Sequence, residues 1–450
     1  MIGPKILKFP SKTPGDDPIV ITGIGLACSL GSNREDVWKA IQRGQSGVRL
    51  TTEDDPVGPL RLPAAMIDWL DAPQLRLAGE EEQPRHALKS LRITECLVEE
   101  ALEDADLPWD ALDRGRFGCS ISAQFGHVNL KSQTPADGQA YPEWQEEFLP
   151  CTASGVVGSR YGLHGPRLCH TTACASGLVS TIAGARALQD GQADFMLCGA
   201  ADAVTELVFS SFYRMGVFSK GPDVATACKP FDRKRNGFVM GEGGSMMVLE
   251  RRSHAIERGA TIYAELSSSS TMCQAHHVTG LDQQSDTLSR LIGELLRKSE
   301  WQSHDVDYIS AHGTGTEQND VTELSGIRAA LGEAADELLI SSNKAVAGHL
   351  INAAGSLELA IAALAMRDSY APPTMHLTDP EPVGEIDCLA QTGHVGSIDR
   401  ILKLSLAFGG HLVGMGLKRF DHAAANMRQA LPLVSDALVR NHWAASRTAA

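Results

Sequence analysis

The sequence predicts a layered α/β fold made of two halves with similar element order. Short apolar runs rich in β-branched residues alternate along the chain with helical or loop segments, which is the pattern of α/β layers. The two halves have similar element order without a close sequence repeat between them. The chain has 450 residues, 43% of them hydrophobic, so it can bury a large core.

We divide the chain into four parts: a flexible leader at 1–17, an N-terminal half at 18–265, a C-terminal half at 266–420 and an alanine-rich tail at 421–450. The N-terminal half opens with a β-branched run that glycine ends, which predicts a buried strand. The strands expected in this half lie at 18–25, 117–121, 195–197, 245–249 and 262–266.

The C-terminal half begins with a helix-period stretch at 286–298 and a strand at 306–310. A strand, a loop and a long helix of small residues follow at 339–366. Two closing strands are expected at 401–407 and 413–417.

Composition and charge exclude several classes of protein. The formal charge of −15 argues against binding to nucleic acid or to an anionic membrane surface, because both need a basic footprint. No apolar stretch reaches the roughly 18 residues that a membrane span needs, and the first residues lack the apolar core of a secretory signal. We therefore expect a cytoplasmic enzyme.

The ten cysteines are scattered without a CxxC pair, which indicates neither a disulfide framework nor a zinc ribbon. The histidine pairs His164/His170 and His276/His277 lack a companion at ligand spacing, so no catalytic metal is expected.

Cys174 lies in the run Thr-Thr-Ala-Cys-Ala-Ser-Gly, and a helix pattern follows it until Gly191. A thiol at the N-terminal end of a helix is expected to have a lowered pKa, because it lies at the positive end of the helix dipole. Its small neighbours allow a tight turn and the approach of a substrate chain. The alternative, a buried structural cysteine, stays open on this heptapeptide alone.

Two histidines lie far downstream in glycine-containing turns. His312 directly follows a predicted strand, and the alternating threonines after it offer hydroxyls to an amide-bearing arm. His349 follows Gly348, with Lys344 five residues before it. Either histidine alone is typical of a core or turn residue, but one thiol and two imidazoles together favour carbon–carbon bond formation on thioesters.

The motifs at 171–177, 311–323 and 342–355, in this order, resemble those of the β-ketoacyl-acyl-carrier-protein synthases, in particular the type II elongating class of the thiolase-like superfamily. The segments 230–243, 258–266 and Pro-Pro-Thr at 372–374 support the resemblance, which covers about residues 18–420. The second histidine separates this class from thiolases and priming synthases. The resemblance implies a thiolase-like fold, with duplicated α/β halves in an α-β-α-β-α sandwich.

The resemblance also implies a mechanism. Cys174 would accept an acyl chain, and malonyl-acyl-carrier protein would lose its carboxylate and attack that chain to give a β-ketoacyl-acyl-carrier protein. His312 and His349 would stabilise the negative charge on the thioester oxygen, while the backbone N–H groups of Cys174 and Phe408 would hold the acyl oxyanion. No cofactor is implied beyond the phosphopantetheine of the acyl carrier protein that carries the substrates.

Further residues receive supporting roles from the resemblance. They are Lys344 with Glu323 as its paired carboxylate, Phe408 as the gating aromatic, and Thr314, Thr316 and Thr279 near the phosphopantetheine arm. We interpret Asp232, Arg235 and Glu242 as loop-organising residues.

The predicted helix 84–104 carries Arg85, Lys89 and Arg92 on one face, because they lie four and three residues apart. This basic face is a candidate for carrier-protein docking, and a solvated helix face is the alternative. The Arg-Met-Asp run that is usual for the family is missing here.

The chain departs from the family pattern around the gate and the acyl pocket. Alanine at 407 stands for a glycine, so we expect a stiffer gate. The other departures are Leu404, Leu406, Leu412, Asn352, Asn236 and the run 123–127.

These departures favour a specialised polyketide or polyene pathway over fatty-acid elongation. A non-catalytic partner subunit, similar to a chain-length factor, is the main alternative, although such subunits typically lack the nucleophilic cysteine. A cysteine hydrolase would explain only one histidine. We expect a homodimer by analogy, with a heterodimer of related subunits left open.

Overall fold

The computed structural model describes residues 17–421, except 54, 56–57, 72–87, 123–148, 220–222, 225–226 and 285. The leader up to 16, the tail from 422 and the run 123–127 lie outside the described residues. None of the described helices is long and apolar enough to cross a membrane.

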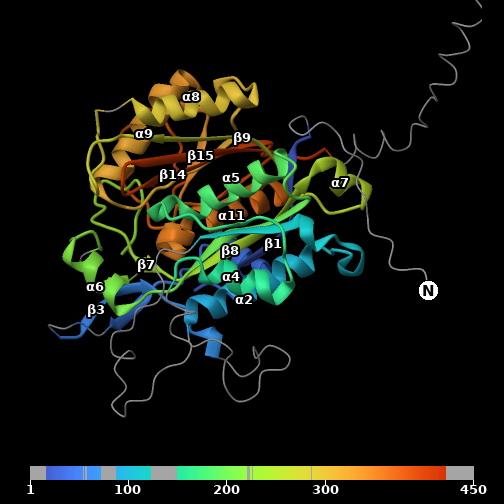
Figure 1. The fold of residues 1–450 in the computed structure, drawn as a ribbon. Helices are drawn as coiled ribbons and strands as arrows, with labels where there is room; N and C mark the ends of the chain where they lie inside the picture. The colour runs from blue at the N-terminus through green and yellow to red at the C-terminus, as the bar shows by residue number, and fades with distance from the viewer. Residues whose placement is uncertain are drawn as a thin grey trace, which may run out of the picture.

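A mixed sheet of ten strands runs through the described structure, and its two halves lie on either side of the helices α5 (Ser176–Gln189) and α11 (Ala354–Asp368) (Figure 1). Its order is β11-β10-β14-β15-β9-β1-β8-β6-β4-β5. The strands of the first half are β1 (Ile19–Cys28), β4 (Phe117–Ser122), β5 (Arg167–Leu168), β6 (Phe195–Asp202) and β8 (Gly243–Arg251). Those of the second half are β9 (Ala264–Cys273), β10 (Tyr308–Ser310), β11 (Leu339–Ser341), β14 (Arg400–Ala407) and β15 (His411–Lys418).

The two halves of the sheet have the same topology. In each half the first strand in the chain lies at the centre, and the fifth, fourth, second and third strands follow outwards. The pairings also match, since β4 is parallel to β5 and β6 as β10 is parallel to β11 and β14, while the remaining neighbours are antiparallel. The duplication predicted from element order is therefore confirmed at the level of structure. The boundary at residue 265 stays a prediction.

Helices complete the five layers (Figure 1). The central layer holds α5 (Ser176–Gln189) and α11 (Ala354–Asp368), which pack on each other and on strands of both halves. The outer layers are α2 (Lys89–Asp104) with α4 (Thr152–Tyr161), and α8 (Thr287–Ser299) with α9 (Glu317–Leu331). The predicted α-β-α-β-α sandwich is confirmed. Residues 84–87 of the expected helix 84–104 lie outside the described residues.

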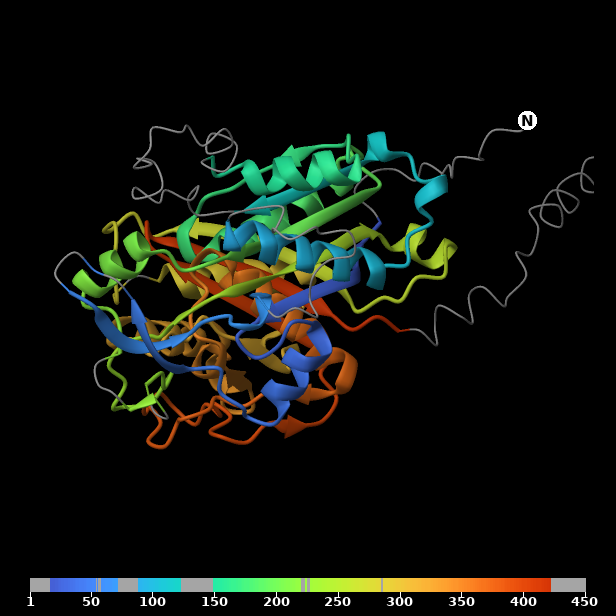
Figure 2. The same cartoon turned by 90° about the horizontal axis from the view of Figure 1, so that it is seen from below.

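Smaller elements border the sandwich. They are α1 (Arg34–Gln42), α7 (Arg252–Glu257), α10 (Lys344–Ala347), the sheet of β2 (Arg49–Glu53), β3 (Leu60–Ala65) and β7 (Met240–Gly241), and the pair β12 (Tyr370–Ala371) with β13 (His394–Val395). Figures 1 and 2 both place α6 (Glu206–Arg214) beside the β2 and β3 hairpin. Arg214 of α6 joins Asp55 of that hairpin at 2.7 Å.

The central helices approach each other closely where they begin. A Cβ atom on Gly177 would lie 2.8 to 2.9 Å from atoms of Ser356, and one on Gly355 would lie 3.1 Å from Leu178. The residues just before the two helices are therefore brought together. Cys174 precedes α5 and His349 precedes α11, so the topology itself joins the two motifs.

The close approach of α5 and α11 predicts the effect of adding one methyl group. Gly177→Ala should lower the free energy of unfolding by about 1–3 kcal/mol, because Ser356 must move away. Gly293→Ala on α8 is the matched control, since a Cβ there meets nothing within 4 Å. This control should leave stability unchanged or raise it by about 0.5–1 kcal/mol. Urea unfolding measures both, and equal stabilities for the two variants would contradict the packing described.

Candidate active site

Cys174 lies in a strained turn that leads into α5. The turn is a short 3-10 segment, Ala173–Ala175, and Ala173 has a φ of +46°, which is unusual for a residue with a Cβ. The Ser176 hydroxyl donates to the Ala173 carbonyl at 2.7 Å and accepts from the Thr172 N–H at 2.8 Å. These bonds hold the turn in place. Cys174 itself is only 6% exposed.

The environment of the Cys174 sulfur differs from the sequence prediction. Burial raises the pKa of the Cys174 thiol to about 12, although Lys344 and the backbone N–H groups of Cys174 and Phe408 act to lower it. The lowered pKa predicted from the helix end is therefore wrong for the unloaded site, because desolvation outweighs the favourable contacts. The two N–H groups that contact the sulfur are the pair expected to hold the acyl oxyanion.

His312 and His349 lie edge to face in the same pocket. Their ring centroids are 5.4 Å apart with an interplanar angle of 82°, and both side chains are buried. Burial lowers the pKa of each well below its usual value, and the positive charges of Lys344 and Lys403 lower it further. Both imidazoles are therefore neutral at pH 7.

The hydrogen bonds of each ring fix which nitrogen carries the proton. The Ile351 N–H donates to Nδ1 of His349 at 3.1 Å. Nδ1 of His312 lies 3.4 Å from the Lys344 ammonium, which can only donate. Nδ1 is thus an acceptor in both rings, and Nε2 carries the proton. Each histidine is set up as a neutral hydrogen-bond donor.

Lys344 lies behind His312 and is 1% exposed. Its Nζ donates to the His312 carbonyl and pairs with Glu358 of α11. The pairing of Lys344 with Glu323 that the resemblance implied is therefore wrong. Glu358 projects from α11 onto Lys344, whereas Glu323 is turned towards the backbone of the His312 loop.

Glu323 holds that loop instead. Its carboxylate accepts the N–H of His312 at 2.6 Å and the N–H of Gly313 at 2.7 Å. Burial raises the pKa of Glu323 to about 7. Glu323 therefore positions His312 through the main chain and not through Lys344.

Two charged residues that the sequence reasoning missed complete the cluster behind the pocket. Glu358 bridges Lys344 and Lys403, with Lys403 Nζ 2.7 Å from its second carboxylate oxygen. Each is the one charged residue in the apolar interior of its element, since the other charges of α11 and β14 lie at the element ends. A charge inside an apolar run must find a buried partner, and this signal could have identified both.

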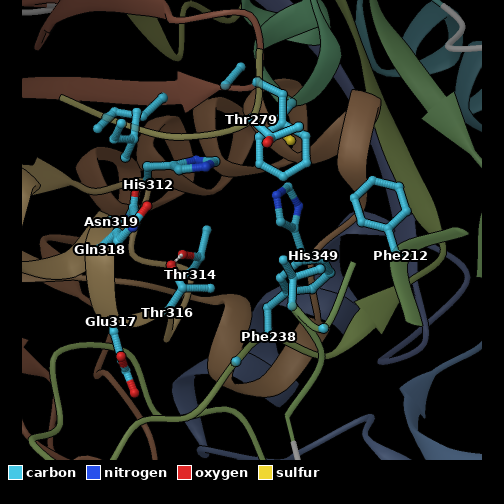
Figure 3. Close-up of a pocket in the computed structure, with 18 of the residues that line it drawn as sticks. Phe212, Phe238, Thr279, His312, Thr314, Thr316, Glu317, Gln318, Asn319 and His349 are labelled. Carbon is cyan, nitrogen blue, oxygen red and sulfur yellow. Dashed lines mark hydrogen bonds between the residues drawn. The ribbon is translucent and has the colours of Figure 1, made fainter. Parts of the chain in front are cut away.

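The pocket has a volume of about 360 Å³. Figure 3 shows His312 and His349 pointing into it, with Thr314 and Thr316 on the side of His312 and with Phe212 and Phe238 near His349. The Thr314 and Thr316 hydroxyls bond each other at 2.8 Å. Seven of the predicted site residues line the pocket, namely Cys174, Thr279, His312, Thr314, Thr316, His349 and Phe408.

The backbone conformation of the gate, the turn with Phe408 that follows β14, differs from the expectation for Ala407. Ala407 ends β14 without a positive φ, and the positive values fall on Gly409 (+85°) and Gly410 (+75°). The premise for a stiffer gate is therefore wrong, because the turn's unusual conformations lie at retained glycines. Phe408 stacks on Phe212 with ring centroids 6.1 Å apart and planes 13° apart.

The other departures are buried in the core or line the pocket wall. Leu404, Leu406 and Leu412 belong to the hydrophobic cluster under α8 and α9. Asn352 is fully buried and donates from Nδ2 to the Ser122 carbonyl at 3.2 Å. Asn236, which lines the pocket, accepts from the Ser219 hydroxyl at 2.9 Å.

Of the predicted carrier-docking residues, Lys89 and Arg92 make contacts within the chain. Lys89 pairs with the buried Glu242 at 2.5 Å, and Arg92 donates to the Leu70 carbonyl at 2.9 Å. Arg85 lies outside the described residues. Docking through this face stays a prediction.

The loop-organising residues have the partners that such a role requires. Asp232 accepts the N–H groups of Lys234, Thr378 and Asp379. Arg235 donates to the Thr316 carbonyl at 2.9 Å. No cluster of histidine, cysteine and carboxylate side chains that could hold a metal ion lies among the residues that the structure describes.

Comparison with known families matches most of the chain. Residues 16–255 match the beta-ketoacyl synthase N-terminal domain, and residues 263–378 match the beta-ketoacyl synthase C-terminal domain. The chain therefore belongs to the beta-ketoacyl synthase family, acyltransferases that carry out the condensation of fatty-acid or type II polyketide synthesis. The family and the enzyme class predicted from the motifs are confirmed.

Relatives come from both kinds of pathway. The chain is 30% identical over 411 residues to 3-oxoacyl-[acyl-carrier-protein] synthase 2 of Synechocystis, covering 90% of this chain and 98% of the relative. It is 32% identical over 421 residues to the actinorhodin polyketide beta-ketoacyl synthase 1 of Streptomyces coelicolor, covering 90% of each.

Solved structures show the same fold. One is a type II polyketide ketosynthase in complex with its acyl-carrier protein and bound to the hexaketide, with a TM-score of 0.79 and 28% identity over 90% of this chain and all of that chain. Another is the ishigamide ketosynthase/chain length factor, with a TM-score of 0.78 and 26% identity over the same shares. Related ketosynthases thus bind acyl carrier protein and pair with a chain-length factor.

The shared carboxylate predicts a strong effect of removing its charge. Glu358→Gln should lower the free energy of unfolding by about 3–5 kcal/mol, because two buried ammonium groups lose their partner. Glu294→Gln on α8, whose ion pair with Arg297 is exposed, should change stability far less. Thermal and urea unfolding compare the two, and a Glu358→Gln protein as stable as wild type would contradict the cluster.

Proposed function

We propose that this chain catalyses the decarboxylating Claisen condensation of an acyl group on Cys174 with malonyl-acyl-carrier protein, giving a β-ketoacyl-acyl-carrier protein. One observation carries the proposal. A single pocket joins the Cys174 thiol, two backbone N–H groups at its sulfur and two neutral imidazoles that present N–H donors.

Acyl transfer is the first step. The Cys174 sulfur attacks the carbonyl carbon of the carrier thioester, the C–S bond to phosphopantetheine breaks, and the thiol proton passes to the departing thiolate. The N–H groups of Cys174 and Phe408 stabilise the oxyanion between these events. Because burial keeps the thiol protonated, its proton must leave as the sulfur bonds to the carbonyl carbon, and the departing phosphopantetheine thiolate is the group that accepts it.

Condensation is the second step. The malonyl C–C bond to the carboxylate breaks, carbon dioxide leaves, and the electron pair becomes an enolate whose oxygen accepts hydrogen bonds from His312 and His349. The enolate carbon attacks the acyl carbon, the bond to Cys174 breaks, and the Cys174 thiolate takes up one proton from solvent. Neutral donors suit this step, since they stabilise the enolate without protonating it.

The partner of the reaction is an acyl carrier protein, whose phosphopantetheine we place between Thr279, Thr314 and Thr316 at the pocket wall. Structures of related ketosynthases with a carrier protein and with a chain-length factor support a carrier-dependent enzyme that works as a homodimer or as a heterodimer with a related subunit. We place it in the cytoplasm, because all ten cysteines are free, as in a reducing compartment.

The alternative is a non-catalytic partner subunit similar to a chain-length factor. A chain that only shapes a partner's tunnel has no need of a strained turn that presents a thiol to two donors. The complete set of reacting groups therefore favours catalysis. The departures at Leu404, Leu406, Leu412 and Asn352 favour a specialised polyketide or polyene pathway over fatty-acid elongation.

Acylation of Cys174 tests this function directly. Incubation with acyl-carrier thioesters of several lengths should add the acyl mass to Cys174, and Cys174→Ala should gain none. After malonyl-carrier protein is added, His312→Ala and His349→Ala should each condense about 100- to 1,000-fold more slowly, because one donor to the enolate is lost. Intact and peptide mass spectrometry reads both steps.

Two outcomes would reject the proposal. No acylation at any chain length, alone or with a related subunit, would indicate a non-catalytic subunit. Release of the acyl group to water without condensation would indicate a hydrolase.

The lowered histidine pKa values predict the pH dependence of condensation. An imidazole whose pKa is lowered in the folded protein stays neutral as the pH falls through 6.5, so kcat/KM should show no acid limb centred there. Stability behaves differently. Because the unfolded chain takes up protons below about pH 6.5, the free energy of unfolding should decrease as the pH falls from there towards the lowered values. An acid limb at or above pH 6.5 would contradict neutral donors.

A further inference from the structure

Lys403 is a buried charged residue that the proposed reaction does not use. It is 0% exposed, and it is the only charged residue inside the apolar strand β14 after Arg400. Its Nζ is surrounded by oxygen. The neighbours are the carbonyls of Ser310 at 3.4 Å, Ala311 at 3.3 Å and Leu404, together with Oε2 of Glu358 at 2.7 Å.

The surroundings of Nζ favour an ammonium group, against burial and the charge of Lys344, which both lower the pKa of Lys403. All four neighbours are acceptors, and a neutral amine would direct its lone pair at one of them. Burying a charge without partners is costly, and the four oxygen atoms offset this cost by accepting hydrogen bonds from the ammonium or pairing with it. Because Glu358 is shared with Lys344, the cluster contains two positive charges and one negative charge.

The cage joins the strand ends that carry the reacting groups. Ser310 and Ala311 immediately precede His312 at the end of β10, and Ser310 lies opposite Lys403 in the parallel pairing of β10 with β14. Leu404 continues along β14 towards Phe408, whose N–H contacts the Cys174 sulfur. The Lys403 ammonium thus connects the end of β10, which precedes His312, to β14, which leads to Phe408.

We propose that Lys403 is a positioning residue of the condensation. Its side chain acts as a tethered internal cation that holds together the strand ends leading to His312 and Phe408. With Lys344, it also supplies positive charge next to the two imidazoles. The kinetic part of this inference rests on the proposed function. The binding of a free cation by Lys403→Ala does not depend on the proposed function.

The electrostatics agree with this geometry. The charge of Lys403 adds to burial and to Lys344 in lowering the pKa of His312 and of His349. Other titratable groups also face the site, and they remain in place when Lys403 is changed. They are Cys174 before α5, Asp202 on β6, Asp320 and Glu323 on α9, Lys344 on α10 and Glu358 on α11.

Two substitutions separate charge from packing. Lys403→Gln keeps a polar side chain in the cage but removes the charge. Lys403→Ala empties the cage, which then offers oxygen ligands to a small monovalent cation. Lys418→Gln, at the exposed end of the neighbouring strand β15, is the matched control.

Kinetics of the acylated enzyme test positioning. Lys403→Gln should lower kcat for condensation by on the order of 100-fold with KM little changed, since the reacting groups are misplaced. It should also move the acid limb of kcat/KM to higher pH, because a positive charge beside the imidazoles is lost. Lys418→Gln should match wild type in both. A normal kcat and an unmoved acid limb in Lys403→Gln would overturn the proposal.

Cation binding gives a readout that needs no activity. Ammonium chloride should raise the Tm of Lys403→Ala with saturation, relative to tetramethylammonium chloride at equal ionic strength, and should leave wild type and Lys418→Gln unaffected. It should also restore part of the lost condensation. No difference between the two salts in Lys403→Ala would overturn the internal-cation role. If the wild-type protein fails to condense but ammonium still raises the Tm of Lys403→Ala, the proposed function is rejected and the cation site is retained.

Discussion

The site depends on a buried carboxylate shared between two lysines. Glu358 lies on α11, Lys344 on α10 and Lys403 on β14, so their ion pairs connect the central helix layer to the second half of the sheet. Such a cluster is costly to desolvate and brings little net stability by itself. Its effect is local, because Lys344 holds the His312 carbonyl and ring while Lys403 holds the strand end before it. The cluster thus helps to position His312, and its two ammonium charges add to burial in keeping both histidines neutral.

The duplicated topology explains why the reacting groups come from different halves. Equal strand order places α5 and α11 side by side in the central layer, and each helix is preceded by a tight turn. The first turn presents Cys174 and the second presents His349. The end of β10 contributes His312 from the side. Because the two helices approach closely at Gly177 and Ser356, the turns that precede them lie next to each other and line one pocket.

The sequence predicts the features that depend on short local patterns of residues. The layered fold and many of its strands and helices could be predicted from short runs of the sequence. The motifs of Cys174, His312 and His349 are also local, and the structure brings these three residues into one pocket, while their catalytic roles stay a proposal. Sequence reasoning failed where the answer depends on packing between distant segments. Glu323 was paired with Lys344, yet Glu358, fourteen residues after Lys344, makes the contact.

The sign of the Cys174 pKa shift shows the same limit. The helix end was visible in the sequence, but the burial that outweighs it was not. Ala407 was expected to stiffen the gate, whereas the positive φ values fall two and three residues later. Each of these errors concerns a three-dimensional environment and none concerns the identity of an element.

The central claim is that His312 and His349 act as neutral Nε2–H donors beside Cys174. Nitrogen-15 NMR of the two imidazoles at neutral pH, assigned with His312→Gln and His349→Gln, tests it most directly. The account predicts a protonated Nε2 and an unprotonated Nδ1 in each ring, unchanged between about pH 6 and pH 8. An imidazolium signal, or a ring protonated on Nδ1, would contradict it.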